Sequence, residues 1–473
     1  MSKYFWILSF FSVLFFSSCV DDEQPLSQPF VIAFANQSLN YSNIQNEQKI
    51  ELDFSKPASQ NGVVIIEIVD ENAEYDNDYT TTPKAQNKQI RLPYEKDANR
   101  LSFSFTNLIY PFDRADKRIQ FKIKTIESDE AYSIQGYTQL TISFEASIGA
   151  TLAPNVGGPN EPNQVYIDLS EEKMFEVRRD QWDFGFYTGN EFRVILNGSI
   201  YMAAKKLLVY DIDQVTEDQV KIFFPQVAVG TFDAQNAAYI DHPSGDINQT
   251  AIAEIADNDD ENSVYLINLG YEVGSITPAI GSVAIAGDHR GWMKIRVLKR
   301  NGNYLLQYAK LNETTHREIV ISKNSRANFS FVNLQEHKLV EAQPESTKWD
   351  IGFTVFTTLI EGSGSYGNSD FIVHNRLGSV EVYMVTETKD QTFSSFSKSM
   401  IDASKFDKDI RTIGSNWRNV FEGTVIKNRF FILKDTEGYF YKLRMLNLKN
   451  TSGERGYPRL EYQLIPCLLY TSD

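Results

Sequence analysis

The stretch Trp182-Asp183-Phe184-Gly185-Phe186 decides the fold of this chain, because it returns 167 residues later as Trp349-Asp350-Ile351-Gly352-Phe353. A second stretch recurs with it: Val165-Tyr166-Ile167-Asp168-Leu169 precedes the first copy, and Phe331-Val332-Asn333-Leu334 precedes the second. The offset of this second stretch is 165 residues, so the second copy has gained two residues in between. The period is too long for a solenoid, whose units span a few tens of residues. Each copy is large enough to be a domain with its own core.

Each copy also closes with the same pattern. In the first copy, Lys294 to Leu298 and Tyr304 to Tyr308 flank a turn at Asn301-Gly302. In the second, Phe430 to Leu433 and Tyr439 to Leu443 flank a turn at Glu437-Gly438. Aromatic and branched residues on both sides of a glycine turn predict β-hairpins. We therefore predict two tandem β-rich domains, which span residues 165–325 and 328–466.

A further domain precedes the repeats. Residues 30–146 contain alternating segments such as Gly62 to Val69, Leu101 to Phe105 and Leu140 to Phe144, at a spacing typical of a β-sandwich. Residues 147–164 have the glycine- and proline-rich composition of a linker. The short junction at Arg326-Ala327 predicts that the two repeats pack against each other.

Helical periodicity is scarce throughout the chain. The two best candidates for helices are Glu217 to Phe224 and Ser394 to Phe406, in corresponding middle regions of the repeats. Aromatic residues make up 13% of the chain, and valine, isoleucine and threonine are frequent, as in strands. The predicted fold class is all-β, with an N-terminal sandwich followed by the two repeats.

The first residues have the pattern of a signal peptide. A charged start, an apolar run from Tyr4 to Phe16 and small residues ahead of Cys19 predict a signal peptide over residues 1–18 and a tether over 19–29. The cysteine resembles that of the bacterial lipobox, which implies that Cys19 is lipidated and holds the protein at the outer membrane. Plain secretion with an incidental cysteine is the alternative. Asp21 to Glu23 resemble the surface-export signal of Bacteroidetes lipoproteins, which implies a location on the cell surface.

Charge and cysteine content narrow the choice of partners. The formal charge is -16, with 62 acidic and 46 basic residues, which argues against nucleic acid and against electrostatic binding to anionic lipid. Besides Cys19 the only cysteine is Cys467, so no intrachain disulfide is expected once Cys19 is lipidated. Residues 467–473 break the preceding strand pattern, and we expect them to be a non-native tail outside the fold.

The order of the repeated elements resembles the HmuY-type haem-binding lipoproteins of Bacteroidetes. Both copies carry a short strand, a Trp-Asp-x-Gly-Phe strand, a variable middle region and a closing aromatic hairpin. The resemblance covers residues 163–322 and 329–466. It implies a β-rich fold, haem binding at the cell surface for iron acquisition, and transfer to an outer-membrane receptor of the TonB-dependent type.

Haem iron takes histidine or methionine ligands in an apolar cleft. In the resembled family they come from the middle region, where the first copy has His242 and His289 and the second has Met384 and Met400. These four residues are the candidate haem ligands, although neither copy has the family's paired histidines in an alignable position. Their alternatives are surface histidines and core methionines. Two further candidates of lower rank follow the Trp-Asp strands, namely Met202 and His374.

The Trp-Asp motif itself is interpreted as core. Trp182 and Trp349 alternate with apolar residues on a strand, and Asp183 and Asp350 are expected to accept hydrogen bonds from a neighbouring turn. No nucleophile elbow, phosphate loop or zinc-protease motif occurs, and the glycine-rich residues 361–367 are interpreted as a strand reversal. We therefore expect a binding protein and no enzyme. The alternative to haem is adhesion or glycan binding.

One metal site needs consideration in the first domain. Residues 73–83 resemble Calx-β and related immunoglobulin-like domains, in which acidic loops hold calcium. The carboxylates here that correspond to such loops are Asp70, Glu71, Asp76 and Asp78. A linear acidic run does not by itself bring six to eight oxygens to one point, so a solvated loop is the competing interpretation, as it is for residues 257–261. No metal site is predicted.

Overall fold

The computed structural model describes residues 30–40, 47–71, 73–108, 118–143 and 149–465. The predicted signal peptide, the lipidation site at Cys19, the acidic cluster after it and the tail with Cys467 lie outside the described residues. The chain is built from strands with a few short helices, so the predicted all-β class is confirmed. Among the described residues no helix is long and apolar enough to cross a bilayer.

The N-terminal domain is a β-sandwich, as predicted, and each of its two sheets has five strands. Alternating strands bury one face each, for example the apolar residues of β6 (Gln89–Tyr94), and a continuous core fills the space between the sheets. One sheet has the order β5 (Tyr79–Thr82), β7 (Arg100–Asn107), β3 (Glu47–Phe54), β1 (Phe30–Phe34) and β9 (Tyr132–Ser133). The other has the order β2 (Ser38–Asn40), β10 (Gln139–Ser143), β8 (Arg118–Glu127), β4 (Gly62–Glu71) and β6 (Gln89–Tyr94).

Four larger sheets make up the two repeats. The first sheet has the order β11 (Gly149–Leu152), β32 (Arg455–Leu464), β31 (Phe440–Lys449), β30 (Arg429–Lys434) and β27 (Glu381–Thr386). The second has the order β13 (Lys173–Arg178), β12 (Asn163–Asp168), β25 (Ile351–Ile360) and β26 (Gly364–His374), and the third has the order β15 (Val194–Leu196), β14 (Phe184–Tyr187), β23 (Phe329–Asn333) and β24 (Lys338–Val340). The fourth has the order β16 (Ala203–Lys206), β17 (Tyr265–Asn268), β20 (Trp292–Arg300), β21 (Asn303–Lys310) and β22 (Arg317–Ile321). Two short ribbons join β18 (Tyr271–Val273) to β19 (Ala286–His289) and β28 (Arg418–Asn419) to β29 (Thr424–Val425).

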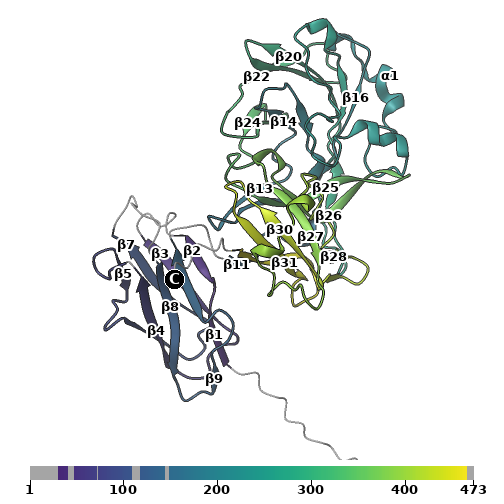
Figure 1. The fold of residues 1–473 in the computed structure, drawn as a ribbon. Coiled ribbons are helices and arrows are strands. Elements are labelled where there is room, and N and C mark those ends of the chain that lie inside the picture. Colours follow the sequence, from purple (N-terminus) through teal and green to yellow (C-terminus); the bar gives the residue numbers. More distant parts are fainter. Residues whose placement is uncertain (1–29, 41–46, 72, 109–117, 144–148, 466–473) are drawn as a thin grey trace, which may run out of the picture.

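The two repeats exchange their first strands. Strand β12 of the first repeat pairs with β25, the Trp-Asp strand of the second, with Val165 opposite Phe353. Strand β23 of the second repeat pairs with β14, the Trp-Asp strand of the first, with Val332 opposite Phe184. In Figure 1, β24 lies in the upper part of the molecule with β14, and β13 lies lower, with β25 and the yellow-green strands.

Each core therefore contains residues of both copies. Val165, Ile167 and Leu169 are buried in the core of the second repeat, and Val332 and Leu334 in the core of the first. The expectation that each copy holds its own core is corrected by this exchange. Two copies of one strand pattern offer equivalent edges to each first strand, so pairing across the copies satisfies the backbone as well as pairing within them.

The predicted linker also contains structure. Gly149–Leu152 form the edge strand β11, which pairs with β32 of the second repeat and buries Ala150 completely. The composition of residues 147–164 indicated a linker because glycine and proline disfavour regular structure. The exposed edge of β32 nevertheless accepts a short extended segment, which satisfies its unpaired backbone groups. Thr151 of this strand is hydrogen-bonded to Tyr137, which connects the repeats to the N-terminal domain.

The local predictions were right for hairpins and partly wrong for helices. Strands β20 and β21 close the first repeat and β30 and β31 the second, as predicted. Residues 217–224 begin with α1 (Glu217–Val220), as expected, but residues 394–406 hold only two single turns of 3-10 helix. Serine and threonine side chains bond to one another and to the backbone there, for example Ser395 with Thr392, which competes with helix formation. The short helices are η2 (Gly158–Asn160), η3 (Gly198–Ile200), η4 (Ile212–Gln214), η5 (Lys221–Phe223), η6 (Ala234–Tyr239), η7 (Asp259–Glu261), η8 (Arg376–Gly378), η9 (Lys398–Met400) and η10 (Ala403–Lys405).

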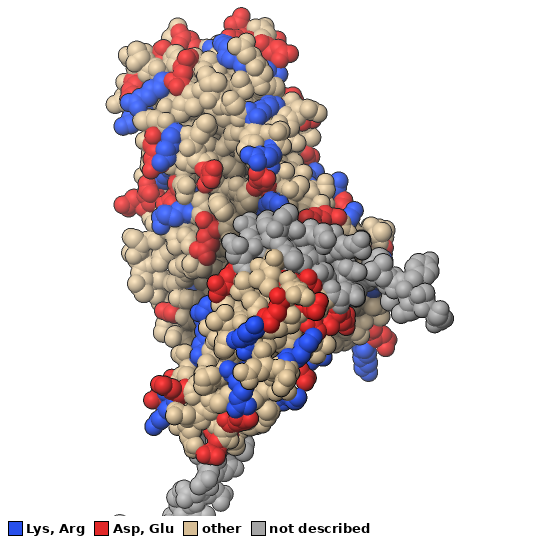
Figure 2. Space-filling model, turned by 90° about the vertical axis from the view of Figure 1, so that its left-hand side faces the viewer, with Lys and Arg blue, Asp and Glu red and all other residues tan. Residues whose placement is uncertain are grey.

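The surface carries both signs of charge. In the face shown in Figure 2, acidic and basic side chains are interspersed over the described residues, with no single-sign patch. Mixed surface charge of this kind does not favour a highly charged polymer as partner. The functional site has to be sought in the interior and its openings.

Candidate functional site

The exchanged strands bring the two tryptophans of the repeated motif into one cluster. Trp182 packs edge-on against Phe331, at 4.8 Å between ring centroids, and Trp349 packs in the same way against Tyr166, at 5.0 Å. Each tryptophan thus contacts an aromatic residue of the other repeat. Both are only 5% exposed, so their predicted place in the core is confirmed.

The aspartates of the motif connect the repeats. Asp183 accepts a hydrogen bond of 2.7 Å from the backbone N–H of Leu334, and Asp350 accepts one of 2.8 Å from that of Leu169. The predicted bond to a turn is confirmed, and the turn belongs to the other repeat. Burial raises the pKa of both carboxyls, but for Asp183 the nearby guanidinium of Arg290, at 2.7 Å, opposes this rise.

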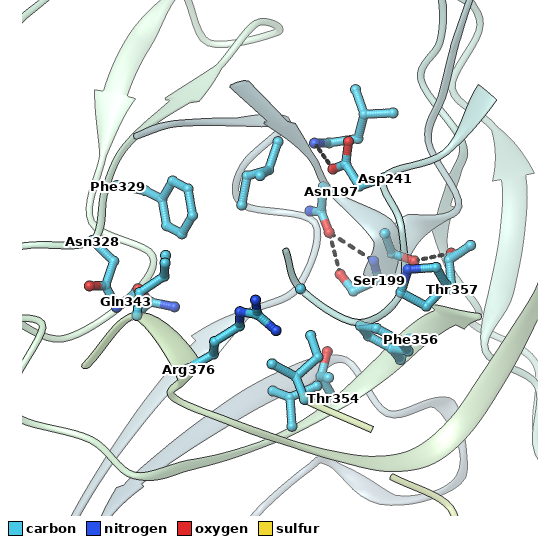
Figure 3. Close-up of a pocket in the computed structure, with 18 of the residues that line it drawn as sticks. Asn197, Ser199, Asp241, Asn328, Phe329, Gln343, Thr354, Phe356, Thr357 and Arg376 are labelled. Carbon is cyan, nitrogen blue, oxygen red and sulfur yellow. Dashed lines mark hydrogen bonds between the residues drawn. The ribbon is translucent and has the colours of Figure 1, made fainter. Parts of the chain in front are cut away.

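A cavity of about 210 Å³ lies between the repeats, where these contacts meet. Both motif tryptophans line it, and so do Asn197 and Asn375 at equivalent positions in the two copies. Each asparagine begins a 3-10 helix and donates from its amide nitrogen to the carbonyl of the motif tryptophan in its own repeat, at 2.7 and 2.8 Å. Figure 3 shows side chains from both repeats around this space. The cavity is therefore a pseudo-symmetric site that neither copy forms alone.

Two of the predicted ligands are histidines of the first repeat. His242 lines the cavity, with Nδ1 at 2.8 Å from the hydroxyl of Ser244. His289 lies on the exposed strand β19 outside the cavity, and both of its nitrogens are occupied, by Asn268 and by the backbone of Gly291. His289 is thus exposed, as expected, but it lies on a strand and not in a turn, whereas His242 is half-buried beside the cavity.

The two predicted methionine ligands lie apart from the cavity. Met384 is 38% exposed on β27, and Met400 is 36% exposed on η9. Neither is among the residues that line the cavity. Met400 was predicted to lie on a helix of residues 394–406, which is absent.

The two lower-ranked candidates do line the cavity. Met202 is 1% exposed and packs in the core of the first repeat, and His374, also 1% exposed, ends strand β26. Neither ring nitrogen of His374 makes a hydrogen bond, although the backbone of Lys408 lies nearby. Burial lowers the pKa of His374 to about 4, so the imidazole is neutral at physiological pH. A neutral imidazole with free nitrogens is suited to bind a metal centre or a hydrogen-bonding ligand.

Sequence reasoning missed the carboxyl of Asp241. It lines the cavity and accepts backbone hydrogen bonds from Leu196 and Ala251, at 2.7 and 2.8 Å. Burial raises its pKa to about 7 despite these bonds. The Asp-His-Pro sequence around it had indicated only an exposed turn, and nothing in the local sequence reveals the strand that covers it.

Within the described residues no three histidine, cysteine or acidic side chains gather as for a metal ion. In the first domain, the carboxylate of Asp70 pairs with Lys88, and that of Asp76 lies 3.0 Å from Lys84. In residues 257–261, Asp257 and Asp259 pair with Lys299 and Arg300. The interpretation as a solvated loop thus holds for Asp76 and for residues 257–261, whereas Asp70 and Glu71 end strand β4 and the Asp70 side chain is only 7% exposed. The glycine-rich residues 361–367 form the turn and first part of the β25–β26 hairpin, as interpreted.

A second and larger cleft, of about 660 Å³, lies on the first repeat beside Trp292 and Tyr308. Its most buried cation, Arg290, is committed to Asp183, and the Trp292 ring is covered on one side by Phe224, at 4.0 Å between centroids. It lacks a counterpart of the paired tryptophans. The inter-repeat cavity is therefore the candidate functional site.

An all-β chain whose two strand-exchanged repeats enclose one cavity with polar and apolar lining has the form of a ligand-binding protein. The HmuY protein family model matches residues 160–310 and 325–462, which correspond to the two repeats. The chain belongs to the HmuY family, whose members are binding proteins, and it carries the family domain twice in tandem.

Two solved structures are similar to part of the chain. The crystal structure of the apo-form Calx CBD1 domain is 11% identical, with a TM-score of 0.20, over 24% of this chain and 97% of that one. The crystal structure of CBD12 from CALX1.2 is 8% identical, with a TM-score of 0.20, over 31% of this chain and 75% of that one. No curated protein matches the chain.

Proposed function

We propose that this protein captures haem or a related ligand in the cavity between its repeats and serves haem acquisition at the cell surface. Membership of the HmuY family, a haem-binding type of surface protein, supports the class of function. The observation that carries the proposal is the convergence of His242, His374 and Met202 on one cavity. These are the side-chain types that ligate haem iron.

The side chains that line the cavity suit haem iron, whereas the volume of the cavity is small for a porphyrin. His374 is neutral, buried and without a hydrogen-bond partner, and Met202 supplies a thioether in the same lining. Sites that enclose a whole drug-sized ligand measure roughly 300–1,000 Å³, whereas this cavity measures about 210 Å³. A porphyrin is therefore only partly enclosed unless the repeats separate slightly. When bound, the iron supplies coordination, and the protein supplies ligands and shelter from water.

A haemin titration of the soluble form that starts after Cys19 tests the proposal. We expect a saturable, sharpened Soret band, whose position separates histidine from methionine ligation. His374→Ala, His242→Ala and Met202→Leu test the cavity, and His289→Ala and Met400→Leu are matched controls outside it. A spectrum equal to that with an unrelated protein contradicts haem binding and leaves adhesion or glycan binding as the function. Equal loss in the control variants contradicts the location.

The proposal includes the setting of the protein. Cys19 is the lipidated first residue of the mature chain, and its lipid anchors the protein in the outer membrane. A TonB-dependent receptor is the partner that receives the ligand. Metabolic labelling with a fatty-acid analogue tests the anchor, since Cys19→Ala should abolish the label. Protease treatment of intact cells tests surface exposure, because an outward-facing protein is degraded while a periplasmic one is protected.

A further inference from the structure

The pseudo-symmetry of the cavity shows which repeat differs at the site. Asn197 and Asn375 occupy equivalent positions, since each precedes a 3-10 helix and bonds to the tryptophan carbonyl of its own motif. The residue before the asparagine is Leu196 in the first repeat and His374 in the second. The residue after it is Gly198 in the first and Arg376 in the second. The second repeat therefore presents polar groups where the first presents apolar or no side chains.

Unsatisfied polar atoms gather on the same side. Trp349 Nε1 and both ring nitrogens of His374 are buried without a hydrogen-bond partner, and so is Gln343 Oε1. All three residues belong to the second repeat and line the cavity. In the first repeat the equivalent tryptophan nitrogen, Trp182 Nε1, donates to Gln164 at 2.9 Å. Buried polar groups without partners cost free energy, so their presence around a cavity points to a ligand that satisfies them.

Arg376 brings a charge to this side. Its guanidinium points into the middle of the cavity in Figure 3. One nitrogen donates to the Lys408 carbonyl at 3.2 Å, and the nearest carboxylate oxygen, of Asp246, is 3.9 Å away, beyond hydrogen-bond length. That carboxylate already accepts hydrogen bonds from Asn248 and Gln249. The guanidinium therefore retains donors for a further anionic group.

The opposite wall does not compete for Arg376. The carboxyl of Asp241 has both oxygens in hydrogen bonds from backbone N–H groups. Asn197 and Ser199 are likewise bonded to each other and to the backbone of the first repeat. Asp241, Asn197 and Ser199 of the first repeat therefore have their hydrogen-bonding groups already satisfied.

We propose that the second repeat supplies the polar recognition of the ligand in this cavity, and that the ligand carries a carboxylate, which Arg376 binds. The inference rests on the proposed function only in placing the ligand in this cavity. Arginine and carboxylate form paired, charge-assisted hydrogen bonds of fixed geometry, so Arg376 selects for the acid. Trp349 and His374 contact the remaining polar atoms of the ligand.

A matched pair of small probes tests this inference apart from iron ligation. 2-Naphthoate and 2-naphthamide have the same size and differ in charge, and calorimetry measures the affinity of each for the soluble form. We expect the acid to bind at least about tenfold more tightly than the amide, since a hydrogen bond to a charged group contributes about 1.5–3 kcal/mol. Arg376→Gln should remove this preference, and Arg376→Lys should restore part of it.

Arg326→Gln is the control, because Arg326 lies outside the cavity and 76% of its side chain is exposed. It should keep the preference for the acid. Equal binding of the two probes to the unchanged protein overturns the inference, as does an unaltered preference in a folded Arg376→Gln variant or no binding of either probe. If the inference fails in one of these ways but haemin still gives a sharpened Soret band, the proposed function stands. If the protein prefers the acid but does not bind haemin, the inference stands and haem is not the ligand.

Discussion

Replacing the motif aspartate with asparagine should have opposite consequences in the two repeats. Asp183 is fully buried, and its carboxylate lies 2.7 Å from the guanidinium of Arg290, whose side chain is 1% exposed. In Asp183→Asn the amide oxygen still accepts the hydrogen bond from Leu334, so the shape of the site is retained. The guanidinium, however, loses its nearest counter-charge and keeps that of Glu272, whose carboxylate lies 3.7 Å from Nε and is 47% exposed. Removing one partner of a buried ion pair costs about 3–5 kcal/mol.

Asp350 has no cation beside it. Its oxygens accept from the backbone N–H groups of Leu169 and Thr436, and the carboxyls of Asp168 and Asp435 lie close enough, together with burial, to raise its pKa well above the usual value. A carboxyl whose folded pKa is raised lowers stability as the pH rises above its unfolded pKa of about 4. Asp350→Asn removes this penalty but has a single acceptor oxygen, so the longer bond, of 3.2 Å from Thr436, is lost. The two effects oppose each other, and at neutral pH we expect a change within about 1 kcal/mol or a gain in stability.

Differential scanning calorimetry of the soluble form at pH 7 measures the difference. The strand-exchanged unit of about 300 residues should melt in one transition, and 3–5 kcal/mol should lower its Tm by roughly 5–8 °C in Asp183→Asn. Asp350→Asn should leave the Tm within about 2 °C of the parent or raise it. Equal losses in both variants would refute the electrostatic reasoning. Separate transitions for the two repeats would refute the shared cores.

Three further predictions test other features. Gly270→Ala should lower stability by more than about 2 kcal/mol in thermal melts, because Gly270 has φ +70° and a Cβ there would lie 1.8 Å from the carbonyl oxygen of Ile200; unchanged stability would contradict this close approach. The free energy of unfolding should fall by up to about 3 kcal/mol as the pH falls from 6.5 to 4, because the histidine is protonated in the unfolded chain before the buried His374 of the folded chain takes up a proton. Denaturant melts of His374→Leu should not show this decrease at low pH. Ala150→Glu should destabilise the repeats by about 3 kcal/mol or more, because Ala150 is fully buried in β11; a harmless substitution would mean that residues 147–164 are a free linker.

Local patterns sufficed to predict the strands but not their partners. The hairpin of β20 and β21 could be predicted from neighbouring residues, because Asn301 and Gly302 in its turn both tolerate positive φ. It forms as expected. The pairing of Val165 with Phe353 joins segments almost 190 residues apart, and the alternation of apolar residues is the same for either partner. The duplication therefore allowed the strands to be predicted from the sequence, but not which copy each first strand pairs with.

The same limit applies to the site. His374 stands at the end of a strand pattern, where a histidine is an ordinary core residue, and only the folded chain brings it into one lining with Met202 and His242. Met400 was ranked higher because it lies in the variable middle region, where the resembled family has its ligands, but it is 36% exposed and outside the lining of the cavity. Ranking by position within one repeat cannot identify a cavity formed by two.

The exchange of first strands also sets an order of events during synthesis. A chain made from its amino terminus has the Trp-Asp strand of the first repeat long before it has Val332 and Leu334, which complete that repeat's core. The second core has the converse history: Val165 and Ile167 are available early and remain unpaired on that edge until Ile351 and Phe353 follow. Strand β11 waits longer still, for Arg455–Leu464 near the end of the described chain. The first half is complete only after β24 (Lys338–Val340) has been made, and the second only after β32, so apolar strands of both remain exposed during synthesis and are sites at which a chaperone binds.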